Sequence, residues 1–190
     1  DAYSFHCSEE DMKATYENMK QAYLRVFKRL GLDVIIASSD SGEIGGAFSE
    51  EFLVKSKYGE GDDSLMEIGH IFQLGTTYSE KMDLRDNVRG FVQMACYGIG
   101  ISRLMMAVME SHRDDLGFFG DDVFSTYDVA ISAIDYHKNE EVKSLSDDLF
   151  AKLKSAGFSV ILDDRQDNAG KKMVDSELIA VKKRIIISRQ

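Results

Sequence analysis

Residues 94–103 restrict the fold of this chain more than any other segment, because they join a strand to a helix within ten residues. Apolar residues alternate before the join, and apolar residues at helical spacing follow it. Gly98 and Gly100 lack a Cβ atom, so a flat ligand can approach the backbone here. Arg103 lies in the first helical turn, where its planar guanidinium can donate two parallel hydrogen bonds to a phosphate. A phosphate-binding corner and a buried corner with a solvated arginine both fit this pattern, since short Gly-x-Gly strings are common.

A second informative strand is predicted at residues 66–74. With a side-chain period of two, His70 and Phe72 share one face and Glu67 lies on the other, unless a bulge at Gly69 intervenes. Polar and aromatic side chains on one strand suit the floor of a site for a small polar ligand. The alternative is a core histidine that packs beside a core phenylalanine.

The remainder of the first hundred residues predicts one long helix and further strands. The helix follows a capping-box pattern that begins at Ser8, and Gly31 ends it. Strands are predicted at residues 33–37 and 48–56. The glycine-rich loop 40–46 between them either wraps a ligand or only turns the chain.

The order of the predicted elements changes after the charged segment 112–122. It becomes strand, helix, strand, helix, strand, which implies right-handed crossovers and a largely parallel sheet. These elements are expected at residues 128–134, 139–156, 158–162, 173–181 and 184–187. We therefore expect a first domain over residues 1–116, a linker over 117–126 and a second domain over 127–190.

The composition predicts a cytoplasmic globular protein with no membrane partner. The 190 residues are 44% hydrophobic, and no apolar run approaches the roughly 18 residues that span a bilayer. Two cysteines, Cys7 and Cys96, are too few for a disulfide or zinc scaffold. The net charge of −10 excludes a broad basic surface for nucleic acid, although residues 158–190 hold seven basic and five acidic side chains.

The chain contains no proline, where average usage would place about nine or ten. Its first six residues also read like the end of a strand. We therefore expect a fragment of a longer protein, or a sequence from which proline was removed.

Five short strings occur together in the order typical of one family. They are DAYSFH at residues 1–6, DSGEIGG at 40–46, GHIFQLGT at 69–76, CYGIGISR at 96–103 and LDDR at 162–165. Nearly the whole chain resembles the C-terminal half of a bacterial-type prolyl-tRNA synthetase, without the large editing domain that bacterial relatives often carry near residues 59–64. The resemblance implies an α+β fold: a class II antiparallel sheet with helices, followed by a small α/β anticodon-binding domain with a mixed or mostly parallel sheet.

The resemblance also implies a reaction, in which ATP and Mg²⁺ activate proline before its transfer to tRNA(Pro). Arg103 and Glu67 are the implied catalytic residues. Arg103 would hold the γ-phosphate, and Glu67 would lie near the nucleotide and its magnesium. Gln73, Gly98 and Gly100 complete the implied ATP site, and no resident metal site is expected.

Two further sets of residues follow from the same resemblance. His70, Phe72 and Cys96 would shape the pocket for the proline ring. Asp164, Arg165 and Lys171 match the region that meets the anticodon bases, because single-stranded loops are recognised through splayed bases.

The first two signature motifs of the family have no counterpart in this sequence, and one of them would supply the arginine for the α-phosphate. We therefore expect the chain alone to be inactive or feeble, and the full-length enzyme to be a homodimer. A non-catalytic paralogue, or a redesigned proline-free fragment that binds nucleotide, amino acid or RNA, remains the alternative.

Overall fold

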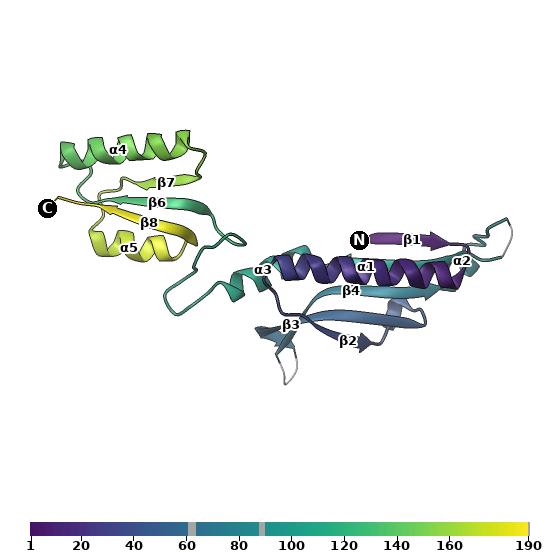
Figure 1. Ribbon diagram of the computed structural model, residues 1–190. Helices are drawn as coiled ribbons and strands as arrows, with labels where there is room; N and C mark the ends of the chain where they lie inside the picture. Colours follow the sequence, from purple (N-terminus) through teal and green to yellow (C-terminus); the bar gives the residue numbers. More distant parts are fainter. Residues whose placement is uncertain (61–63, 88–89, 190) are drawn as a thin grey trace. The chain divides into compact units, whose positions relative to one another are not determined.

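The computed structural model describes residues 1–60, 64–87 and 90–189, which form two compact units, Asp1–Val108 and Met109–Gln190 (Figure 1). In this described part of the chain, no helix has the length and apolar character needed to cross a membrane.

The first unit is built on a five-stranded antiparallel sheet with the strand order β1-β5-β4-β3-β2. Its strands are β1 (Ala2–His6), β2 (Ile35–Ser39), β3 (Phe48–Glu60), β4 (Leu65–Gly75) and β5 (Gln93–Ile99). Its helices are α1 (Glu9–Arg29), α2 (Thr77–Lys81) and α3 (Ile101–Ser111), with a single 3₁₀ turn η1 (Gly42–Ile44). The predicted antiparallel class II sheet is confirmed.

Helix α1 lies along one face of this sheet (Figure 1). The rings of Tyr23 and Phe27 pack on Phe52 of β3, with centroids 5.3 and 5.4 Å apart. Gly69 in β4 allows this close approach, because a Cβ there would lie 3.3 Å from the ring of Phe27. The helix therefore buries one face of the sheet, and His70 and Phe72 of β4 lie on the opposite face.

The glycine-rich loop before β3 packs against the end of β4. A Cβ atom on Gly46, whose φ is +107°, would lie only 2.5 Å from the carbonyl oxygen of Gln73. The hydroxyl of Tyr78 donates to the carbonyl of Ile44 at 2.6 Å. These contacts hold the loop against the end of β4 and against α2.

The second unit contains the parallel sheet β7-β6-β8 between two helices, as predicted (Figure 1). Its strands are β6 (Tyr127–Ala133), β7 (Val160–Asp163) and β8 (Val181–Ile187), and its helices are α4 (Glu140–Ser155) and α5 (Ala169–Glu177). Helix α5 begins earlier than the pattern predicts, because the side chain of Asn168 accepts from the backbone N–H of Lys171 and caps the first turn. Ala180 takes a φ of +48° after the helix, so the chain turns early into β8.

The segment before β6 is packed tightly onto the second unit. Cβ atoms on Gly117 and Gly120 would lie 2.4 Å from the carbonyl oxygen of Glu177 and 2.6 Å from that of Ala180. The N–H of Phe118 donates to the carbonyl of Glu177 at 2.9 Å. Glycine is therefore required where this segment crosses the turn between α5 and β8.

Candidate functional site

The face of the first sheet that lies opposite α1 carries two neighbouring rows of side chains. Strand register defines the first row, in which Tyr3, Cys96, Phe72 and Ser49 lie side by side on β1, β5, β4 and β3. The second row contains Gly98, His70 and Glu51 on β5, β4 and β3. An aromatic and thiol row thus lies beside an imidazole and carboxylate row.

A bulge in β4 brings Glu67 onto this face. The pairing with β3 shifts between Gly69 and Glu67, so that Ile68 has no partner residue of its own. Simple alternation would separate Glu67 from His70, but Nδ1 of His70 lies 3.3 Å from Oε1 of Glu67. The same nitrogen lies 3.8 Å from Oε1 of Glu51. A bulge therefore interrupts the strand, as in the second alternative, and it lies at Ile68, one residue before the expected Gly69.

Arg103 joins this cluster from the first turn of α3. Its Nη1 donates to Oε2 of Glu67 at 3.2 Å, and its guanidinium lies over Gly100, where a Cβ would approach Nε to 3.0 Å. The side chain is 51% exposed and has one carboxylate partner among the described residues. Because exposed ion pairs contribute only about 0–1 kcal/mol, this arginine can exchange its partner for a bound phosphate at small cost.

His70 and Phe72 form an aromatic wall of this site. Their rings stack with centroids 3.9 Å apart and an interplanar angle of 21°, and Cys96 packs against the cluster around Phe72. Nε2 of His70 is buried and has no hydrogen-bond partner among the described residues. A ligand that supplied a partner to this nitrogen would satisfy a buried polar atom.

The fold places the predicted residues of the first unit unequally. Glu67, His70, Phe72, Cys96, Gly98, Gly100 and Arg103 gather on one side of the sheet. Gln73 pairs with buried Ala95, and strand alternation turns it toward the opposite face from Phe72. Its predicted role with ATP stays a prediction.

Three residues of this face, Tyr3, Ser49 and Glu51, were not identified from the sequence. Tyr3 is 57% exposed beside Cys96, which raises the pKa of the Tyr3 hydroxyl through its charge and a side-chain hydrogen bond. Glu51 lies beside His70. Side-chain alternation in residues 1–6 and 48–56 predicts which residues share a face within each strand. Only the pairing register shows that these side chains share a face with those of β4 and β5.

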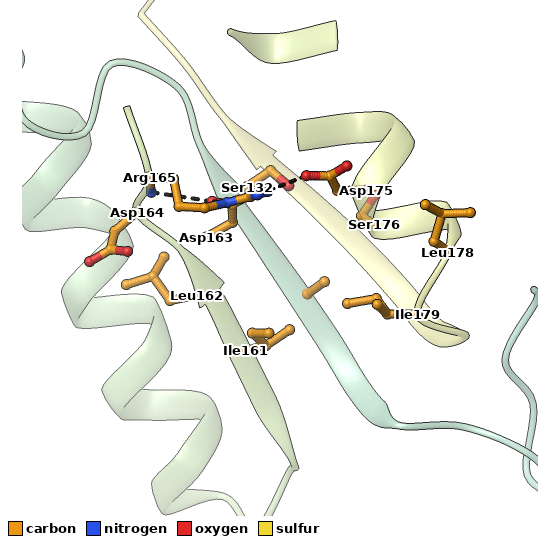
Figure 2. Close-up of a pocket in the computed structure, with 11 residues that line it drawn as sticks. Ser132, Ile161, Leu162, Asp163, Asp164, Arg165, Asp175, Ser176, Leu178 and Ile179 are labelled. Carbon is orange, nitrogen blue, oxygen red and sulfur yellow. Dashed lines mark hydrogen bonds and ion pairs between the residues drawn. The ribbon is translucent and has the colours of Figure 1, made fainter. Parts of the chain in front are cut away.

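The second unit contains a cavity of about 460 Å³ between the sheet and α5. Figure 2 shows its rim, where Asp163 ends β7, Arg165 follows the strand and Asp175 projects from α5. Arg165 donates to both oxygens of Asp163 at 2.9 and 2.8 Å, and to Asp175 at 2.7 Å. The guanidinium of Arg165 lowers the pKa of Asp163. Asp164 and Arg165 thus line the same cavity, but the guanidinium already has two close carboxylate partners.

Adjacent lysines on α5 have opposite environments. Lys172 is fully buried, and its Nζ donates to the carbonyls of Ala133 at 2.6 Å and Asp163 at 3.0 Å. Lys171 is exposed and pairs with Asp167 at 3.0 Å. The buried lysine therefore joins the C-terminal ends of β6 and β7, and the exposed one remains available to a ligand.

Comparison with known proteins identifies the family of this chain. The family profile of the tRNA synthetase class II core domain (G, H, P, S and T) matches residues 1–112. The chain belongs to the class II tRNA synthetase core family. The profile of the anticodon binding domain matches residues 128–190 of this class II synthetase chain.

Relatives of this class II synthetase chain include curated enzymes of known name. It is 33% identical to the proline–tRNA ligase of Sulfurimonas denitrificans over 247 aligned positions, which cover 100% of this chain and 56% of that protein. It is 31% identical to the proline–tRNA ligase of Rhizorhabdus wittichii, with 98% and 56% covered. The chain thus spans little more than half the length of these relatives, and the resemblance noted in the sequence is confirmed.

A solved structure has the same fold. The prolyl-tRNA synthetase of Cryptosporidium parvum, crystallised with L-proline and AMP, superposes with a TM-score of 0.79 at 17% identity. The match covers 97% of this chain and 41% of that chain.

Proposed function

We propose that this chain is a portion of a proline–tRNA ligase, an enzyme that forms prolyl-adenylate from proline and ATP and transfers the prolyl group to tRNA(Pro). One observation carries the proposal. The bulge at Ile68, beside Gly69, brings Glu67 next to His70 and lets Arg103 reach it, close to the glycines of the strand–helix corner. The domain limits 1–116 and 127–190, a homodimeric full-length enzyme and a cytoplasmic location belong to the same proposal.

Arg103 would bind the γ-phosphate of ATP in this reaction. Activation requires the carboxylate of proline to attack the α-phosphate, so positioned cations and a positioned substrate supply most of the catalysis. The half-exposed guanidinium would leave Glu67 for the phosphate, and Gly98 and Gly100 would admit the adenosine close to the backbone. No side-chain nucleophile is needed.

Mg²⁺ would be held in part by the carboxylates on this face. Ligand atoms of Glu51, Glu67 and His70 lie within 4.8 Å of one another. The two carboxylates fit a hard cation that prefers oxygen ligands, and the imidazole is the less suitable donor. When bound, the ion would neutralise negative charge on the phosphates, while Arg103 orients them.

The proline ring would pack against the wall formed by His70 and Phe72, with Cys96 beside them. Proline has an apolar ring and a secondary ammonium group, so an aromatic wall next to carboxylates is a suitable receptor. Asp164, Arg165 and Lys171 of the second unit would contact the anticodon bases.

The test is calorimetric binding of AMPPNP with Mg²⁺ to the full chain. We expect Arg103→Ala to weaken binding about 10- to 100-fold, the usual effect of losing hydrogen bonds to a charged group. Arg85→Ala is the control, because Arg85 is also a half-exposed arginine that pairs with a carboxylate, on Asp83. Equal affinity of the Arg103→Ala variant and the unsubstituted chain would contradict the assigned role.

Proline-dependent pyrophosphate exchange tests the catalytic part of the proposal. We expect the 190 residues alone to exchange feebly or not at all, because positioned groups act as a unit. Vigorous exchange by the chain alone would refute that expectation. Nucleotide binding without exchange, even when the chain is joined to the upstream half of a relative, would instead indicate a binding module.

A further inference from the structure

The loop between β6 and α4 presents an aromatic pair at the C-terminal edge of the second sheet. Its first aromatic residue, Tyr136, is held from several sides. The hydroxyl of Tyr136 donates to Oδ1 of Asp147 at 2.7 Å, and Nζ of Lys143 lies 5.6 Å from the ring centroid. The ring also packs against the hydrophobic core of the unit. Tyr136 is therefore a fixed support.

His137 is exposed and rests on this support. Its ring meets the ring of Tyr136 edge-on, with centroids 5.0 Å apart and an interplanar angle of 81°. Asp135, just before the pair, takes a φ of +60°, in the left-handed region that a residue with a side chain seldom adopts. The turn thus places an aromatic ring at the surface.

A small hollow of about 20 Å³ lies between this loop and the segment that follows β7. Its lining residues are Asp135, Tyr136, His137, Lys138, Arg165, Gln166 and Asp167. The hollow therefore connects His137 with Arg165, which also lines the larger cavity.

The charges around this edge do not favour the phosphate backbone of a nucleic acid. Residues 109–190 contain 12 basic and 16 acidic side chains. Nearby cations already have carboxylate partners, since Lys138 lies 3.7 Å from Asp135 and Arg165 is bonded to Asp163. A nucleic acid that binds here must gain its affinity from its bases.

We propose that His137, supported by Tyr136, is a stacking platform for an unpaired RNA base. The inference rests on the proposed function and deepens it, because it adds the β6–α4 loop to the RNA-binding surface. Exposed aromatic rings, histidine included, stack on splayed bases of single-stranded loops, and the carboxylates of Asp135 and Asp167 can accept from base amino groups. Lys138 and Arg165 set the sides of the platform and stay largely neutralised by their partners.

The experiment is a titration of the full chain with a synthetic RNA hairpin that carries the tRNA(Pro) anticodon loop, followed by fluorescence anisotropy. His137→Ala should weaken binding about 5- to 100-fold, which corresponds to the loss of one stacked base. His137→Phe should bind within about threefold of the unsubstituted chain, because it keeps the aromatic face. The slope of log Kd against log salt should correspond to about one or two phosphates.

Phe158→Ala is the control, because Phe158 is also an exposed aromatic residue but precedes β7 at the other edge of the sheet. Unchanged affinity of His137→Ala would overturn the platform and leave the proposed function intact. Equal weakening by His137→Phe and His137→Ala would also overturn it, since stacking would then not explain the effect. Failure of the unsubstituted chain to bind the hairpin would overturn RNA binding by this unit, and the platform with it.

Discussion

The two units of this chain place their candidate sites differently, because their sheets are exposed differently. The first sheet is antiparallel, and α1 lies on one face, so the site lies across the rows of the other face. The second sheet is parallel and lies between α4 and α5, so its candidate residues lie at the edge where strands end. Strand register therefore controls the first site, and loops after strands control the second.

Arg103 and Arg165 show the same difference between the two units. Arg103 has one carboxylate partner at 3.2 Å, whereas Arg165 donates to two carboxylates at 2.7 to 2.9 Å and lies 3.5 Å from a third, on Asp167. Arg103 can exchange its carboxylate partner for a phosphate at small energetic cost. Arg165 is held by its carboxylate partners, and a ligand would have to compete with several charge-assisted hydrogen bonds. The presence of an arginine near a strand end is therefore weak grounds for phosphate or RNA binding until its partners are known.

The largest effect that would sharpen the comparison is expected from Lys172→Met. The substitution leaves the carbonyls of Ala133 and Asp163 without their buried donor, so we expect a loss of about 3 kcal/mol in the stability of the second unit. Urea unfolding followed by circular dichroism, with limited proteolysis to assign each transition, measures it. Lys171→Met is the matched control and should change stability by less than about 0.5 kcal/mol. Equal effects of the two substitutions would show that burial of Lys172 does not stabilise this edge.

The second-largest effect is expected from pH, and the first unit should lose stability at alkaline pH. Burial raises the pKa of Tyr23 to about 12, and burial also raises the pKa values of Tyr16 and Tyr97 in the first unit. A folded pKa above the unfolded value of about 10 means that this stability is present below pH 10 and is lost as pH rises toward 12. We expect Tyr23 to contribute about 2 kcal/mol of this loss.

The second unit should instead lose stability at acid pH. The pKa of Asp163 is lowered chiefly by Arg165, and that of Asp147 chiefly by the hydroxyl of Tyr136. Stability from a lowered folded pKa is present above the unfolded value of about 4 and is lost as pH falls through the folded value. Melting curves at pH 3, 7 and 11, with proteolytic mapping, measure both ends. A larger drop in melting temperature from pH 7 to pH 3 in the first unit than in the second, or a larger drop from pH 7 to pH 11 in the second than in the first, would break this contrast.

The smallest expected effects are those of the helix caps. The hydroxyl of Ser8 accepts from the N–H of Asp11 in the first unit, whereas Oδ1 of Asn139 accepts from the N–H groups of both Glu141 and Val142 in the second. We expect about 1 kcal/mol of destabilisation from Ser8→Ala and slightly more from Asn139→Ala, because two donors lose their acceptor. Glycine at either position should cost only a few tenths of a kcal/mol. Urea titration of the four variants measures the order of their destabilisation. If alanine destabilised the protein no more than glycine did, the side-chain caps would not stabilise these helices.

Much of the fold could be predicted from the sequence because it depends on local pattern. The capping box at Ser8, the glycine after α1 and the alternation in β4 and β5 correspond directly to elements of the structure. The boundaries of α5 were shifted, because the predicted start relied on apolar spacing and not on the cap at Asn168. Side-chain caps compete with spacing as signals, and here the cap decides where the helix begins.

The candidate site was less accessible to sequence reasoning. Whether Glu67 faces His70 depends on one unpaired residue in β4, and no local pattern fixes that choice. Lys171 and Lys172 are adjacent and chemically identical, but Lys171 is exposed and Lys172 is buried because they lie on different sides of α5. Tyr3 and Glu51 joined the site only when their strands were paired with β5 and β4.

The sequence by itself determined where most helices and strands lie, that the second unit has a parallel sheet, and that the strand–helix corner carries an arginine. The antiparallel sheet of the first unit was implied by the family resemblance. Tertiary structure alone decided which of the charged side chains meet. The physical reason is the range of the two interactions. Backbone preference and side-chain periodicity act over a few residues, whereas the partners of Glu67, Arg165 and Lys172 are set by strand register and by segments that pack together far apart in the chain.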